Sequence, residues 1–134
     1  MLVFEGLLGT HPEAKHRARY EMHKRIGNWP RAMRTFQINE ACARIVWDTV
    51  WRRHYSVDVV TFLDEDAVDA LQDLLDAWGL PVGHVTYSDK AMLARSLNYR
   101  PDVVGVFHPS PADVFTFGSK GFLVDPSNPI LIGA

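Results

Sequence analysis

The chain has a single cysteine, Cys42, and lacks any apolar run long enough to cross a bilayer. A lone cysteine cannot form an internal disulfide, so we predict that Cys42 is a small buried apolar residue in a reducing compartment. The apolar opening at residues 1–4 is interrupted by Glu5 and has no basic region before it, so we expect that it is not a signal peptide. We therefore expect a cytoplasmic protein without a membrane segment.

The chain also lacks a strong net charge and the composition of a disordered or fibrous protein. It has 134 residues, 47% of them hydrophobic, and a formal net charge of −2. A chain of this length buries roughly two-thirds of its unfolded surface, enough for a core without disulfides or metals. We predict one domain that spans residues 1–134.

The small net charge hides an uneven distribution of charged side chains. Residues 58–76 hold seven acidic side chains and no Lys or Arg. Basic side chains gather in the first quarter: Lys15, Arg17, Arg19, Lys24, Arg25, Arg31 and Arg34. A basic face of this kind can meet nucleic acid or phosphate. The simpler interpretation is two solvated helix faces of opposite sign, which pair with one another or with a neighbouring subunit.

Strand-like and helix-like segments alternate along the chain. A short apolar strand is expected at 1–8, and further strands at 57–63, 82–88 and 103–107. Strands followed by helices favour parallel pairing through crossovers, with the chemistry at the carboxyl ends of the strands. We therefore predict a three-layer, Rossmann-like α/β domain with a mostly parallel sheet and the first strand in its centre.

Local signals place the helices and the last strands. Helices are expected at 13–26 after a Thr10 or His11 cap, at 39–54, at 64–78 and after Asp89. The glycines at 118 and 121 predict a short C-terminal hairpin between 114–117 and 122–124. Residues 125–134 form a tail whose apolar end needs burial against its own sheet or a second copy of the chain.

Four segments carry a resemblance to a known family. Residues 3–10, residues 59–61, Lys90 and residues 103–113 stand, in order, where four motifs of the haloacid-dehalogenase-like fold would stand. The chain is also similar to small proteins of this type encoded by tailed phages. The resemblance implies a parallel sheet with a central first strand, motifs at the strand ends, and a helical insertion or crossover at 11–55.

The same resemblance shows which catalytic groups are replaced. The family's first motif supplies two aspartates, but this chain has Glu5 and, two residues on, Leu7. The fourth motif's carboxylates are replaced by His108 and Ser110, with Asp113 the first carboxylate to follow. Neutral His108 and Ser110 are poor Mg²⁺ ligands, and a missing general acid lowers a rate by about 10²–10⁴. We expect no metal and no cofactor.

The strand ends also predict an anion site. The proposed phosphate-binding residues are Gly6, Gly9, Thr10, Thr61 and Lys90. Glycines allow close backbone approach, and a helix that begins near Pro12 directs free amides to the same place. In the alternative interpretation the glycines form a turn, Thr61 is a buried strand hydroxyl and Lys90 is a solvated residue of a first helical turn.

Three functions follow from these observations. The first is a catalytically degenerate protein of this fold that acts by binding, such as a phage accessory protein in the host cytoplasm. Its partner would be an unknown protein, a second copy held through the tail, or a phosphate-bearing small molecule. The second is a Mg²⁺-dependent phosphatase or nucleotidase that uses Glu5, Thr61, Lys90 and Asp113. The third is nucleic-acid binding through the basic helix at 15–25.

His108 is ambiguous on its own. Its place at a strand end is functional in open sheets, so it can be a general base oriented by Asp113. The alternative is a loop residue without a catalytic role.

Overall fold

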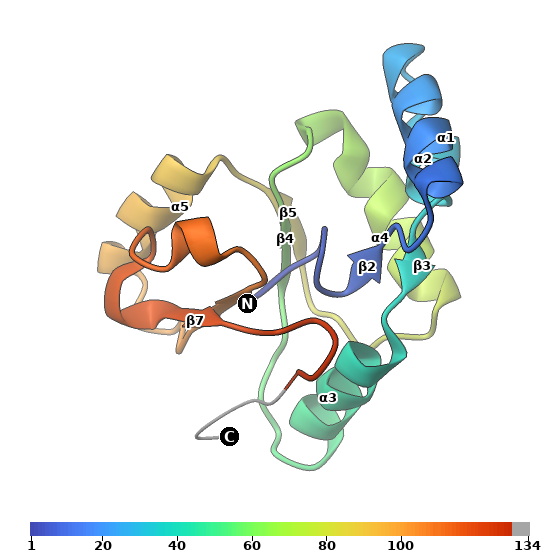
Figure 1. Ribbon diagram of the computed structural model, residues 1–134. Helices are drawn as coiled ribbons and strands as arrows, with labels where there is room; N and C mark the ends of the chain where they lie inside the picture. Colours follow the sequence, from blue (N-terminus) through green and yellow to red (C-terminus); the bar gives the residue numbers. More distant parts are fainter. Residues whose placement is uncertain (130–134) are drawn as a thin grey trace.

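The computed structural model describes residues 1–129 (Figure 1). Within this range a five-stranded sheet has the order β5-β4-β1-β6-β7. Its strands are β1 (Leu2–Val3), β4 (Val59–Thr61), β5 (Val85–Tyr87), β6 (Val106–His108) and β7 (Gly121–Leu123). All neighbouring pairs in it are parallel, so the predicted parallel α/β architecture is confirmed.

Helices connect the strands, and several begin at the predicted capping residues. They are α1 (Ala14–Arg25), α2 (Trp29–Met33), α3 (Glu40–Trp51), α4 (Val68–Ala77) and α5 (Lys90–Ser96). The Asn39 side chain accepts a hydrogen bond from the Cys42 amide, and the Asp89 side chain accepts one from Met92. A 3₁₀ helix, Glu65–Ala67, leads into α4 and is capped by Asp64. These caps confirm the predicted starts of three helices.

Buried side chains on the strands alternate between two hydrophobic clusters. Leu2 and Phe4 belong to the larger cluster with residues of α2, α3 and α4, whereas Val3 belongs to a smaller cluster with Leu93 and Leu97. Figure 1 shows α5 on one side of the sheet and α3 and α4 on the other. Successive residues of a strand point to opposite faces, so both faces of this sheet are covered.

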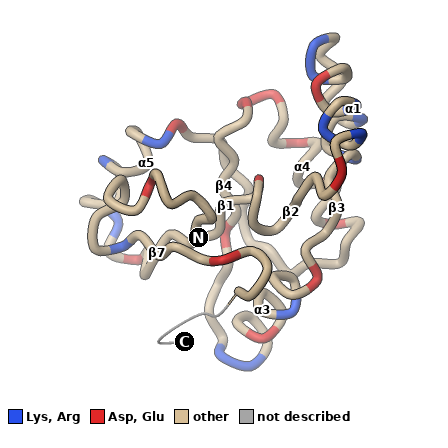
Figure 2. The backbone as a smooth tube through the Cα atoms, in the orientation of Figure 1, with Lys and Arg blue, Asp and Glu red and all other residues tan. Residues whose placement is uncertain are grey.

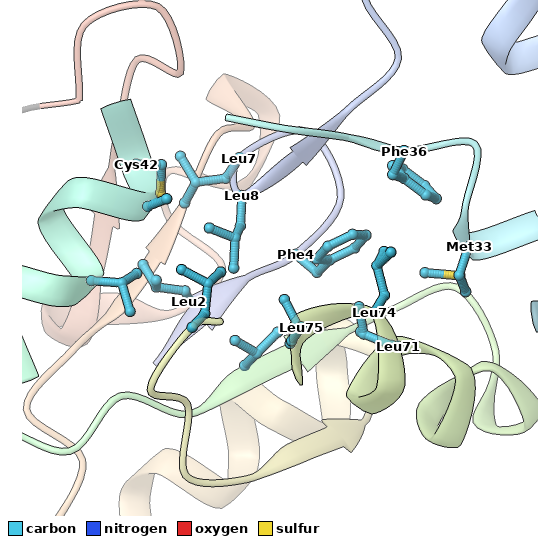
Figure 3. Packing of buried hydrophobic residues seen from close by; sticks show 14 of the residues in the cluster. Leu2, Phe4, Leu7, Leu8, Met33, Phe36, Cys42, Leu71, Leu74 and Leu75 are labelled. Carbon is cyan, nitrogen blue, oxygen red and sulfur yellow. The ribbon is translucent and has the colours of Figure 1, made fainter. Parts of the chain in front are cut away.

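The larger cluster contains the fully buried ring of Phe4, which Figure 3 shows among Met33, Phe36 and Leu71. Cys42 of α3 is in the same cluster, and burial raises its pKa to about 12. The prediction that Cys42 is a buried apolar residue is confirmed.

A separate two-stranded sheet marks where the chain leaves and re-enters the main fold. β2 (Gly9–Thr10) pairs antiparallel with β3 (Gln37–Ile38), and α1 and α2 lie between them in the sequence. Helix α1 reaches away from the main sheet (Figure 1) and carries many of the basic side chains (Figure 2). Tyr20 is its buried residue.

The first strand and the first helix cap differ from the prediction. β1 ends at Val3, because the Phe4 carbonyl accepts the amides of Leu7, Leu8 and Gly9 and so turns the chain. The cap of α1 is Glu13, and Thr10 pairs in β2 instead. Helix α2 was not predicted, although Asn28 caps it and Pro30 lies in its first turn.

The predicted C-terminal hairpin is wrong. Residues 114–117 are a turn, and β7 pairs in parallel with β6. The physical reason is burial of Phe117, which is 4% exposed and packs in the cluster that holds Val106. This anchors the segment against the sheet as a crossover. The apolar end of the predicted tail, 130–134, lies outside the described residues.

No helix in the described part of the chain combines the length and the apolar character needed to span a bilayer.

Candidate functional site

Glu5 lies at the carboxyl edge of the sheet and bonds the end of the neighbouring strand. Its Oε2 atom accepts a hydrogen bond of 3.0 Å from the Thr61 hydroxyl, and its Oε1 atom accepts one of 2.7 Å from the Phe62 amide. The parallel register of β1 and β4 places these ends side by side. Thr61 is fully buried, and its hydroxyl oxygen also accepts the Leu63 amide. The predicted meeting of Glu5 and Thr61 therefore occurs, as a direct hydrogen bond.

Burial raises the pKa of Glu5 above its ordinary value of 4.5. The Phe62 amide, the Thr61 hydroxyl and the positive charge of Lys90 oppose that rise, because each favours the ionised carboxylate. The Glu5 carboxylate thus accepts hydrogen bonds from the Thr61 hydroxyl and the Phe62 amide, two donors that a phosphate oxygen at this strand end would otherwise use.

Lys90 and Asp113 form a second pair at the same edge. The Lys90 Nζ atom lies 2.6 Å from the Asp113 Oδ2 atom, and it lies 5.7 Å from the centre of the Phe62 ring. Asp113 ends a 3₁₀ helix, Pro111–Asp113, that follows β6. The hydrogen bond from Lys90 is the main reason that the pKa of Asp113 is lowered. Lys90 is thereby committed to a carboxylate.

His108 is buried at the end of β6, with 1% of its surface exposed. Its ring meets the Phe117 ring edge-on at 5.4 Å, and within residues 1–129 neither of its nitrogens has a hydrogen-bond partner. Burial lowers its pKa, with the Asp113 charge acting in the opposite direction. The hypothesis of a general base oriented by Asp113 therefore lacks the orienting hydrogen bond. Ser110, the other predicted strand-end residue, stands directly before the 3₁₀ helix Pro111–Asp113.

The glycine turn after β1 uses its own amides. The Gly6 amide donates to the Gly9 carbonyl, and the Gly9 amide donates to Phe4. Gly6 has φ +83°, which favours glycine, and a Cβ atom on Gly9 would come within 2.3 Å of the Phe4 ring. Of the predicted phosphate-binding residues, the structure joins Thr61 to Glu5 and Lys90 to Asp113, and it places Gly6, Gly9 and Thr10 in the turn and in β2.

No group of three or more His, Cys, Asp or Glu residues is arranged to hold a metal ion in the part of the chain that the structure describes. Two carboxylates, Glu5 and Asp113, do stand at the strand ends, but each is already hydrogen bonded to a donor.

A cavity of about 450 Å³ opens beside Glu5, between the strand end and α1. Its walls combine acidic, basic and aromatic side chains, namely Glu5, His11, Arg17, Tyr20, Glu21 and Phe36. Gly6, Thr10 and Leu63 complete the lining. The Tyr20 hydroxyl is buried without a hydrogen-bond partner among the described residues, and burial raises its pKa to about 12. The His11 ring stacks on Phe36 at 3.9 Å and bonds the Thr35 hydroxyl.

Most of the residues that line this cavity were not predicted from the sequence. Tyr20 gave the available signal, because it is one of few residues that can be buried on a strongly polar helix. The positions of His11, Arg17 and Phe36 depend on how residues 11–36 fold back onto the sheet, which has no local signature.

Comparison with protein-family models, with curated proteins and with solved structures gives no match to this chain.

Proposed function

We propose that this protein is a catalytically degenerate member of the haloacid-dehalogenase-like fold that recognises a ligand or partner without transforming it. The strand order supports the fold, since β1 lies between β4 and β6 with parallel pairing on both sides. The two hydrophobic clusters support a three-layer arrangement. Glu5, Thr61 and Lys90 stand at the edge where the family's motifs would stand.

The hydrogen bonds that the Glu5 carboxylate accepts are the observation that carries the proposal. A nucleophilic carboxylate must direct an oxygen lone pair at phosphorus, and the surrounding donors must face the transferred group rather than the nucleophile. Here both oxygens of Glu5 accept hydrogen bonds, from Thr61 and from Phe62. The extra methylene of glutamate lets the carboxylate reach these donors, so the side chain itself occupies the anion position.

The cavity beside Glu5 is the place for recognition. It offers the cation of Arg17, the carboxylates of Glu5 and Glu21, and the Tyr20 hydroxyl, next to the Phe36 ring. Concave sites with a few polar groups on an apolar wall are typical of small-molecule binding. We infer a small ligand with polar groups that Arg17 and Glu21 can bind and an apolar part for Phe36.

A phosphatase assay tests the absence of turnover. With Mg²⁺ and p-nitrophenyl phosphate, we expect the protein and its Glu5→Gln variant to hydrolyse no more substrate than the buffer does. Glu21→Gln is the matched control, because Glu21 lines the same cavity but does not bond the strand end. Hydrolysis that Glu5→Gln abolishes and Glu21→Gln keeps would contradict the proposal and establish the Mg²⁺-dependent phosphatase.

A crystal soaked with Mg²⁺ gives an independent measurement. We expect Glu5 to keep its bonds to Thr61 and Phe62 in the soaked crystal. Density for a six-coordinate cation among the oxygens of Glu5 and Asp113 would sink the proposal even if no substrate had been found.

A further inference from the structure

A second cavity, of about 260 Å³, lies between α1 and α2, and five of its lining residues carry basic side chains. They are His16, Arg19 and His23 of α1 and Arg31 and Arg34 at α2. We call this cavity the α1–α2 pocket. It shares no lining residue with the cavity beside Glu5.

The local fold explains why these residues face one space. His16, Arg19 and His23 are spaced i, i+3 and i+7, so they lie along one side of α1. The chain then reverses at Gly27, whose φ of +73° favours glycine, and the Asn28 amide donates to the His23 carbonyl. Helix α2 returns beside α1 and adds Arg31 and Arg34 from its own i, i+3 pair.

The basic side chains of the α1–α2 pocket form no ion pair with a described residue. Three guanidinium groups line it, and no Asp or Glu of the described chain does so. Among residues 1–129, the ion pairs formed by basic side chains involve Lys15, Arg52, Arg53, Lys90 and Arg100, and none involves these three arginines. The acidic segment at 58–76 therefore forms no ion pair with these arginines within the described residues, although α2 packs beside α4.

The two histidines add a second observation. The Nδ1 atoms of His16 and His23 are shielded from solvent and have no hydrogen-bond partner in the described part of the protein. A protonated imidazole nitrogen of either ring can donate a hydrogen bond to a ligand in the pocket. The pocket thus combines hydrogen-bond donors with positive charge, and none of its lining residues is an anionic acceptor.

We propose that the α1–α2 pocket binds a phosphate group. Arginine presents several N–H donors in a planar fork that matches phosphate oxygens, and hydrogen bonds between charged partners are the stronger ones. A small phosphorylated molecule and a nucleic-acid strand both carry this group. The inference does not depend on the proposed function, because the two cavities are separate.

Isothermal titration calorimetry at low salt tests the site with two probes, inorganic phosphate and a single-stranded oligonucleotide. Arg19→Ala and Arg31→Ala should each weaken binding at least about ten-fold, as expected for loss of a charge-assisted hydrogen bond. Arg25→Ala is the matched control: it removes the same charge from an exposed position of α1 that does not line the pocket. Circular dichroism checks the fold, and the glutamine variant at the same position replaces an alanine variant that unfolds.

The two probes separate the sources of the phosphate. Binding of inorganic phosphate that Arg19→Ala weakens and Arg25→Ala spares supports a pocket for small phosphorylated molecules. Oligonucleotide binding alone, with the same variant pattern and a steep loss of affinity as salt rises, supports a nucleic-acid strand. Absence of binding to both probes would overturn the proposal. An equal loss in Arg25→Ala would also overturn it, because attraction would then come from diffuse charge.

Discussion

The carboxyl edge of the sheet and the α1–α2 unit use similar polar side chains in opposite ways. At the sheet edge, Glu5 bonds Thr61 and Phe62, and Lys90 bonds Asp113. In the α1–α2 unit, Arg19 and Arg31 face a cavity and form no ion pair with a described residue. An edge whose donors and acceptors satisfy one another is stable, so the proposed recognition beside Glu5 depends on the Arg17, Tyr20 and Glu21 side chains that α1 contributes. In the helical unit the Arg34 Nε atom donates to the Pro30 carbonyl, and the Arg19 and Arg31 guanidinium groups face the pocket.

The largest effect on stability is expected from the difference in packing between the buried core below the sheet edge and the exposed surface of α1. Phe4 is fully buried, with its ring centre 4.9 Å from that of Phe36 and 6.1 Å from that of Trp78. Phe4→Ala should lower the free energy of unfolding by about 3–5 kcal/mol, measured by urea denaturation. Met22→Ala on α1, where the side chain is 53% exposed, should change it by no more than about 0.5 kcal/mol. Equal losses of unfolding free energy in the two variants would contradict this difference in packing.

A pH series on Glu5→Gln sharpens the electrostatic side of the comparison. The folded-state pKa of Glu5 lies above 4.5 because the side chain is buried, so the folded protein holds this proton more tightly than the unfolded chain does. The stability that protonation contributes is complete below pH 4.5 and is lost as the pH rises through the folded pKa. The glutamine side chain does not titrate.

We therefore expect the unfolding free energy of wild type to fall, relative to that of Glu5→Gln, as the pH rises from below 4.5 to neutrality. Urea denaturation of both proteins at each pH measures this difference. A difference that stays constant over the whole range would show that burial does not disfavour the Glu5 carboxylate.

The smallest effect is expected at Lys90. Its side chain is 47% exposed, so solvent screens the pair with Asp113, and Lys90→Met should cost less than about 1 kcal/mol of stability at neutral pH. The lowered pKa of Asp113 means that this contribution is present above pH 3.8 and disappears as the pH falls through the folded pKa. Chemical denaturation at neutral and acidic pH checks both points. A cost that persists in acid would assign the role of Lys90 to its contact with Phe62.

Helix starts could be predicted from the sequence because their causes are local. Asn39, Asp64 and Asp89 each cap a helix through an amide two or three residues further along the chain. The partner of β7 could not be predicted in this way. An apolar strand after a glycine turn has the same local pattern whether it pairs with the preceding segment or, as here, with β6.

The site shows the same division between local and distant causes. That Glu5 and Thr61 would share an edge follows from parallel strands, and so does the nearness of Lys90 to Asp113. Which groups bond depends on side-chain length and on the glycine turn after Phe4, in which the Gly6 and Gly9 amides donate to carbonyls of the turn itself. The α1–α2 pocket depends on the reversal at Gly27, which brings α2 back beside α1.

The pairing of β2 with β3 has a consequence for engineering. Thr10 and Gln37 face each other, so the chain departs and returns at adjacent points, and residues 11–36 could be excised and the ends rejoined by a tight turn. The excision would be simple in covalent connectivity but costly in packing, because five of the removed residues belong to the main core: Tyr20, Trp29, Ala32, Met33 and Phe36. A graft from another protein at this junction would have to supply side chains of similar bulk at five positions.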